Sequence, residues 1–274
     1  MKHRIAGLLL AASIACPQTQ PKFEVASVKP SNAADRRLFF NVQPGGRFTV
    51  ANCTAKRLIQ EAYGIKAFQI SGGPGWMGSD LFDIAAKAEG STATNFDQIK
   101  LMLQSLLAER FQLVVRRDTK ELPVYALVVD KNGPKFEAAS ESDPNIIDLS
   151  QRPDLAAGGA RLHFTIIRRG RLTAQGTNMA LLASQLANFL GRTVVDKTAL
   201  SGTYDVKLEW VPDENQVAMF QAMGVPGGFG APPADWQGPS LFAALQEQLG
   251  LKLESQKGPV EIFTIERIDR PSEN

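Results

Sequence analysis

The sequence has few of the side chains that build metal or thiol centres. Among 274 residues there are two histidines, His3 and His163, and two cysteines, Cys16 and Cys53. A structural zinc site needs four such ligands at short spacing, so the sequence excludes one. It also lacks a His-Glu-x-x-His segment, a Gly-x-Ser-x-Gly segment and a Walker loop. The sequence therefore contains no recognised motif for metal-dependent, nucleophilic or nucleotide-dependent catalysis. No cofactor is expected.

No charge of one sign dominates the chain. Lysine and arginine total 30 against 28 aspartate and glutamate, which gives no electrostatic reason to expect nucleic acid as a partner. Hydrophobic residues make up 44% and charged residues 21%, a balance typical of a chain that folds around a core. The apolar run at the N-terminus is too short to span a membrane, and no span is expected after it.

The first residues form a targeting segment. A basic start, Lys2–Arg4, precedes a short apolar run, Ile5–Ile14, and small residues lead to Cys16. This is the plan of a secretory signal over residues 1–15, which a polar tether follows over residues 16–21. The sequence therefore predicts an exported protein.

Cys16 leaves two forms of the mature N-terminus open. Ser-Ile-Ala-Cys resembles a bacterial lipoprotein signal, in which the cysteine is lipidated, although Ser13 stands where leucine is usual. Ordinary cleavage at the same bond fits equally well. The protein is expected in the periplasm, anchored by lipid in the envelope, or secreted. Export would also permit a Cys16–Cys53 disulfide, but a disulfide to a cysteine on a flexible tether would stabilise the fold poorly. Cys53 is therefore expected to be a small buried thiol.

The chain contains an internal repeat. Phe40–Thr49 aligns with Phe164–Thr173 at an offset of 124, and each reads as two short strands around a glycine turn. The alignment runs on into a helix in each copy, with one apolar face in each. These faces are Ala55, Leu58, Ile59, Ala62 and Tyr63 in the first copy, and Met179, Leu182, Ala183 and Leu186 in the second. Thr54, and either Thr177 or Asn178, are expected to cap the two helices.

Further matches complete each copy. Strands at Phe82–Ile84 and Tyr204–Val206 align at an offset of 122, and helices ending near Leu113 and Leu251 align at 138. Each copy is expected to close with a hairpin, whose last strands are Pro123–Leu127 and Pro259–Phe263. The order of elements predicts an α+β fold, with helices packed on small, mostly antiparallel sheets. A further strand at Phe23–Val28 is expected to join the first sheet.

Two segments interrupt this pattern. Residues 137–160 are polar and rich in turn residues, and they are expected to link a first module, residues 22–136, to a second, residues 161–274. Within the second module, residues 213–239 form an insert rich in glycine and proline. A loop of that length is either disordered or functional.

Several stretches carry a family resemblance over nearly all of the mature chain. They are Phe23–Pro30, Gly46–Thr49, Gln69–Trp76, Glu121–Val129, Val194–Thr198, Tyr204–Asp205, Gly238–Phe242 and Lys257–Val260. With these the chain resembles a family of exported proteins of unknown function found in soil bacteria. Similar domains occur fused to membrane metallopeptidases of the penicillin-sensing type, which implies a sensory or binding role and assigns no catalytic residue.

A weaker resemblance points to protein docking. Leu182–Leu186, Gly191–Val195, Ala243–Leu245 and Leu249–Leu251 are similar to the short N-terminal domains of secretins and TonB-dependent receptors. Those domains are periplasmic modules that dock proteins. The resemblance therefore implies an interaction role for the second half of the chain.

The remaining candidates are loop aromatics and carboxylates. Trp76 on a glycine-rich turn, and Phe229 and Trp236 in the insert, are candidate binding residues, unless each folds back over the nearest core. Asp80, Asp83 and Glu89 are the carboxylates that a hydrolase could use. Asp83 has a counterpart, Asp205, in the second copy, so a turn or capping role is the preferred interpretation of that pair.

Two functions follow from these observations, and a purely structural lipoprotein is the third hypothesis. The leading hypothesis is a non-catalytic binding or interaction module of the cell envelope, whose partner is a protein, a peptide or a glycan. The alternative is a hydrolase that acts on envelope polymers through a carboxylate site. An open sheet edge would give the first hypothesis a physical route, because an edge can add the strand of a partner.

Overall fold

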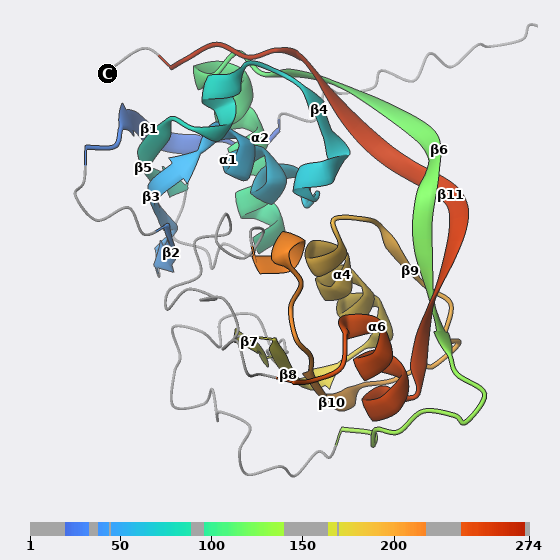
Figure 1. The fold of residues 1–274 in the computed structure, drawn as a ribbon. Helices are drawn as coiled ribbons and strands as arrows, with labels where there is room; N and C mark the ends of the chain where they lie inside the picture. The colour runs from blue at the N-terminus through green and yellow to red at the C-terminus, as the bar shows by residue number, and fades with distance from the viewer. Residues whose placement is uncertain are drawn as a thin grey trace, which may run out of the picture.

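The computed structural model describes residues 20–32, 38–43, 45–88, 96–139, 164–168, 170–217 and 237–271. Its fold is α+β, as the order of elements predicts. Two bodies of helices and short strands lie one above the other in the view, and a long two-stranded ribbon runs along both of them (Figure 1).

The first body is built on a four-stranded antiparallel sheet. Its strands follow the order β1 (Phe23–Pro30), β5 (Leu81–Ala88), β3 (Arg47–Thr54) and β2 (Phe39–Gln43). The strand expected at Phe23–Val28 does join this sheet, at its edge. Apolar residues alternate along β3 and β5, so that one face buries Phe48, Val50, Phe82 and Ile84.

Two helices cover that buried face. They are α1 (Ala55–Tyr63) and α2 (Phe96–Arg110), and the apolar positions of α1 include Ala55, Leu58, Ile59 and Ala62, all buried as expected. The Thr54 hydroxyl accepts a hydrogen bond from the Arg57 N–H at 3.1 Å, which caps the helix as predicted.

The second body has a smaller sheet with the order β10 (Tyr204–Glu209), β8 (Arg171–Thr177) and β7 (Phe164–Arg168). Its helix α4 (Met179–Leu190) is capped by the Asn178 side chain, which accepts from the Leu181 N–H at 2.8 Å. Of the two cap residues that the sequence allows, Thr177 and Asn178, the structure uses Asn178. A short helix α6 (Leu241–Ala244) continues into a π-helical turn, η4 (Leu245–Leu249).

The predicted closing hairpins are wrong. Each is one long strand, β6 (Val114–Val129) or β11 (Leu251–Arg267), and the two strands pair with each other in antiparallel register. The stretch around Thr119–Glu121 has no glycine or asparagine to make a tight turn, and the chain continues its ladder with β11 there instead. Two three-residue strands flank the pair, to give the order β4 (Ile70–Gly72), β11, β6, β9 (Val194–Asp196).

Each long strand of the ribbon contributes buried residues to the core of the body formed mainly by the other half of the chain. β6 starts in the first body and ends in the second, where Leu127 is fully buried, and β11 runs back so that Phe263 and Ile265 are buried in the first. Between the bodies, Val124, Val260 and Ile262 form a third, small apolar cluster. Each core is therefore completed by a strand from the other half of the chain.

The two halves share further details. Pro123–Leu127 on β6 aligns with Pro259–Phe263 on β11 at an offset of 136, and a carboxylate accepts from a left-handed bulge residue in each body, Asp83 from Asn52 and Asp205 from Gly176. These correspondences favour the internal duplication, which stays a prediction. The segments predicted as linker and insert are described only at their ends. There the Ala139 N–H donates to the Thr203 carbonyl at 2.8 Å, and Gln216 accepts from the Trp210 indole at 3.0 Å.

Candidate functional site

The middle of the ribbon is paired on one side only. The parallel pairing of β6 with β9 begins at Tyr125, and that of β11 with β4 begins at Phe263. Before those points each long strand has a single neighbour, the other long strand. Among the described strands, residues 115–123 of β6 and 253–261 of β11 thus have an open edge (Figure 1).

Hydrogen bonds fix which residues of β6 face that edge. The Tyr125 N–H donates to the Thr193 carbonyl, and the Leu127 carbonyl accepts from Lys197, both at 2.9 Å. Odd-numbered residues of β6 therefore direct their backbone groups away from β11. The register has no shift between Val115 and Val129, so Arg117, Thr119 and Glu121 face outward too.

The same parity holds on β11. Gln69 donates to the outward-facing Glu261 carbonyl at 3.0 Å, and Ser255 pairs with Tyr125 in the register. Ser255 and Lys257 therefore present their N–H and C=O groups away from β6. Within the described ranges these groups, like those of Thr119 on β6, have no hydrogen-bond partner.

A proline closes each open edge. Pro123 on β6 and Pro259 on β11 both stand at outward-facing positions, where the missing N–H removes no bond from the ribbon. Because proline cannot donate to an added strand, each edge is limited to the few residues before it.

The edge of β6 is dense in charge. Arg116 forms ion pairs with Asp118 and, at 3.0 Å, with Glu266. The Arg117 guanidinium lies over the rings of Tyr63, at 5.5 Å, and Phe263, at 5.1 Å. Burial raises the pKa of Tyr63, and Arg117 partly offsets that rise. Charged side chains along an edge discourage pairing with unsuitable strands.

The recurring aspartates have a structural role, as preferred from the sequence. Asp83 accepts a hydrogen bond from the Asn52 N–H at 2.9 Å, and Asp205 accepts one from the Gly176 N–H at 2.8 Å. Asn52 and Gly176 both have a left-handed backbone, with φ of 56° and 61°. Each carboxylate thus holds a bulge in the strand beside it.

Asp80 and Trp76 form a separate cluster with the C-terminal segment. The Arg270 side chain donates to Asp80 at 2.9 Å and lies 5.1 Å over the Trp76 ring. Trp76 is half-buried, and its ring meets Phe82 edge-on at 6.2 Å. Asp80 and Asp83 therefore each have a partner of their own. His163, Glu89, Phe229, Trp236 and Cys16 lie outside the described residues.

Cys53 is a buried thiol, as expected. Its side chain is fully buried, and burial raises its pKa to about 12, an effect that nearby Arg57 only partly offsets. A thiol with so high a pKa is a poor nucleophile near neutral pH. In the described part of the chain, no three His, Cys, Asp or Glu side chains lie together as metal ligands.

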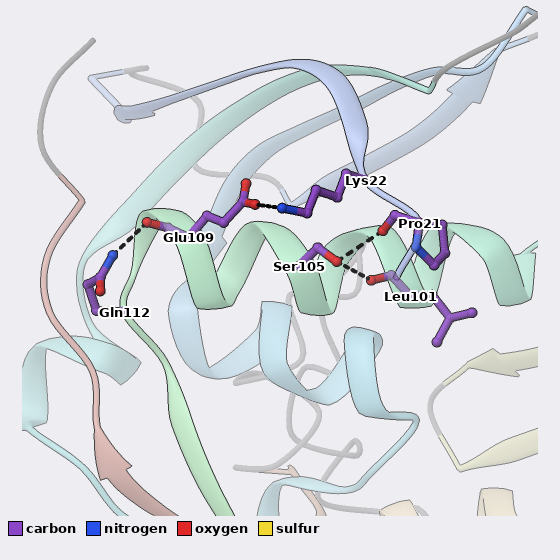
Figure 2. Close-up of polar contacts among 6 residues, drawn as sticks. All are labelled: Pro21, Lys22, Leu101, Ser105, Glu109 and Gln112. Carbon is purple, nitrogen blue, oxygen red and sulfur yellow. Dashed lines mark hydrogen bonds and ion pairs between the residues drawn. The ribbon is translucent and has the colours of Figure 1, made fainter. Parts of the chain in front are cut away.

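The N-terminal segment is docked on α2, a feature that the sequence did not signal. The Ser105 hydroxyl donates to the Pro21 carbonyl at 3.0 Å, and Lys22 forms an ion pair with Glu109 (Figure 2). A cavity of about 150 Å³ lies beside this contact, lined by polar side chains that include Glu24 and Arg110. It is smaller than typical ligand pockets, at roughly 300 Å³ or more. The last residues of the predicted tether are thus part of the folded body.

Residues 56–268 match DUF3738, a family described as a protein of unknown function. The match covers most of the chain, which therefore belongs to this family. The expected resemblance to a family of unknown function is confirmed, while its soil-bacterial origin, its export and the likeness to secretin domains stay predictions. No curated protein and no solved structure matches the chain. Among the described residues, no helix is long and apolar enough to cross a membrane.

Proposed function

We propose that this member of the DUF3738 family is an exported interaction module of the cell envelope. It binds an extended segment of another envelope protein and adds that segment as a strand to the open edge of β11. The observation that carries the proposal is the outward-facing backbone of Ser255 and Lys257, which has no partner in the described part of the chain. Main-chain groups of this kind bind extended peptides with little demand on their sequence.

The edge of β11 suits a varied partner better than the edge of β6. Its centre has two neutral residues, the exposed Ser255 and the half-buried Gln256, between the charged Glu254 and Lys257, whereas β6 has charges at most positions from Arg116 to Glu121. A charged edge requires matching charges on the added strand. An edge with fewer charges accepts more sequences.

The predicted signal places this edge outside the cytoplasm. Cleavage before Cys16 would leave five residues before Pro21, which the Ser105 hydroxyl holds on α2. At about 3.5 Å a residue, a lipid on Cys16 would lie within about 18 Å of that helix. A lipidated form would therefore keep the module close to the membrane surface, where envelope proteins are its neighbours.

The test is capture of partners from native envelope extract by the mature chain. We expect Ser255→Pro to lose a partner that the wild type and Ser255→Ala both retain, because only proline removes the outward N–H group. Proline at this position breaks no bond to β6, so folding should be preserved, and circular dichroism checks that.

Two other outcomes point elsewhere. A partner that Ser255→Pro retains and that deletion of residues 213–239 loses would place binding in the insert, with its candidates Phe229 and Trp236. If neither variant changes capture, the β11 edge is not the site. Turnover of envelope polymers by the unmodified chain would then favour the hydrolase alternative.

A further inference from the structure

We propose that the open edge of β6 pairs with the same edge of a second copy of this chain. The result is a twofold dimer, joined by an antiparallel strand pair centred on Thr119. This inference goes beyond the proposed binding of an envelope partner and does not depend on it, because it uses the other edge of the ribbon.

The backbone of β6 fits its own copy. Arg117, Thr119 and Glu121 face outward, and all three side chains are exposed. In an antiparallel pair centred on Thr119, the Thr119 of one copy faces that of the other, and Arg117 faces Glu121. Each outward-facing residue then meets another outward-facing residue, which is the arrangement in which two strands exchange hydrogen bonds.

The side chains in this register are complementary in charge. Arg117 stands opposite Glu121 on one face of the new pair, and Asp118 stands opposite Lys120 on the other. Opposite charges directly across a strand pair stabilise it, and like charges destabilise it. Because the twofold axis passes through the pair, each favourable contact occurs twice.

In each neighbouring register two identical charged residues meet at the twofold axis. A pair centred on Arg117 would set two arginines face to face, and one centred on Glu121 would do the same with two glutamates. Registers centred on Asp118 or Lys120 also set outward-facing residues opposite each other, but they bring like charges face to face, Asp118 with Asp118 or Lys120 with Lys120. Hydrogen bonding excludes registers that set an outward-facing residue opposite an inward-facing one, and charge then favours the register centred on Thr119.

The other edge of the ribbon does not share this property. A pair of β11 edges centred on Ser255 would set Glu254 opposite Gln256 and Leu253 opposite Lys257. Neither contact joins opposite charges. In the register at the centre of each open edge, charge therefore favours self-pairing of β6 over that of β11, and Pro123, which cannot donate, limits the length of the β6 pair.

Sedimentation equilibrium on the purified mature chain, without any partner, tests the proposal. A short ladder gives a weak dimer, so concentrations from about 10 μM to about 1 mM are needed. We expect the wild type and Thr119→Ala to double in mass over this range. Thr119→Pro, which removes the central outward N–H, should remain monomeric.

A charge exchange supplies a second, independent measurement. Lys120→Glu sets two carboxylates opposite each other and should weaken the dimer at least tenfold, whereas adding Asp118→Lys to it should restore wild-type association. A wild type that stays monomeric throughout would overturn the proposal. So would a dimer that Thr119→Pro and Lys120→Glu leave unchanged, since its interface would then lie elsewhere.

Discussion

The backbone becomes left-handed just after the second helix of each body: Gln112, two residues beyond α2, has a φ of 50°, and Gly250, one residue beyond η4, has a φ of 63°. Each follows a buried residue, Phe111 or Leu249, that fixes the end of the helix in its core. The surroundings differ. Gln112 is exposed, whereas a Cβ on Gly250 would lie 2.0 Å from the Gly133 carbonyl oxygen.

The bulges beside α1 and α4 also place a left-handed non-glycine residue in the first body and a left-handed glycine in the second. Asn52 takes the left-handed conformation in the first body, and Gly176 takes it in the second. The next position holds Cys53 in one body and Thr177 in the other, and both side chains are buried. The two bodies therefore use one backbone plan, while the side chains that the plan tolerates depend on what packs against each position.

Exchange of the two helix-end residues should give the largest effect. Gly250→Gln introduces a Cβ into backbone at a position with positive φ, and we expect it to lower the free energy of unfolding by roughly 3–5 kcal/mol. Chemical denaturation followed by circular dichroism measures this loss.

The reverse exchange is the control. Gln112→Gly relieves a left-handed conformation at an exposed position, and we expect a change within about 1 kcal/mol of the wild type. If Gln112→Gly stabilised the protein by as much as Gly250→Gln destabilised it, the conformation, and not the contact with Gly133, would set the cost.

The exchange of core strands gives the second prediction. Phe263→Ala and Leu127→Ala each remove a buried side chain, at an expected cost of roughly 3–5 and 2–5 kcal/mol. Because Phe263 packs with Tyr63 on α1, at 5.4 Å between ring centroids, its loss should speed amide hydrogen exchange in α1 first. Leu127→Ala should do so in α4, since its core is the second one.

An exposed position on the same strand provides the control. Lys257→Ala should leave the stability within about 0.5 kcal/mol of the wild type. Faster hydrogen exchange in α4 of the second body, and not in α1, would contradict the prediction for Phe263→Ala. It would mean that β11 does not contribute Phe263 to the first core.

The sequence was informative where local rules decide the structure. The offset of 124 located both glycine hairpins and both first helices, and the apolar faces and the Thr54 cap follow from helical spacing and capping chemistry. Recurrence of Asp83 as Asp205 correctly indicated a structural role, because a residue that holds a bulge is needed wherever the bulge occurs.

The candidate site could not be found in this way. Open edges depend on which distant strands pair, and the pairing of β6 with β11 joins residues up to 153 positions apart, such as Val114 with Arg267. Hydrophobic alternation predicts a strand but not its neighbour. The one signal available was negative: no turn residues occur in β6 where the expected hairpin needed them.

The smallest predicted effect sharpens the comparison of Cys53 with Thr177. Burial raises the pKa of the Cys53 thiol from 9.0 to about 12, so folding favours the neutral thiol. The resulting stability is fully present below pH 9 and is lost as the pH rises towards 12, because the unfolded chain releases its proton first.

We expect Cys53→Thr, which copies the residue of the second body, to be less sensitive to alkali. By pH 10 the wild type should have lost roughly 1 kcal/mol more than the variant, when urea denaturation is compared at pH 7 and pH 10 with Cys16→Ala in both chains. Parallel losses in the two chains would mean that the thiol ionises freely in the folded protein, and that the core around Cys53 is more open than its burial indicates.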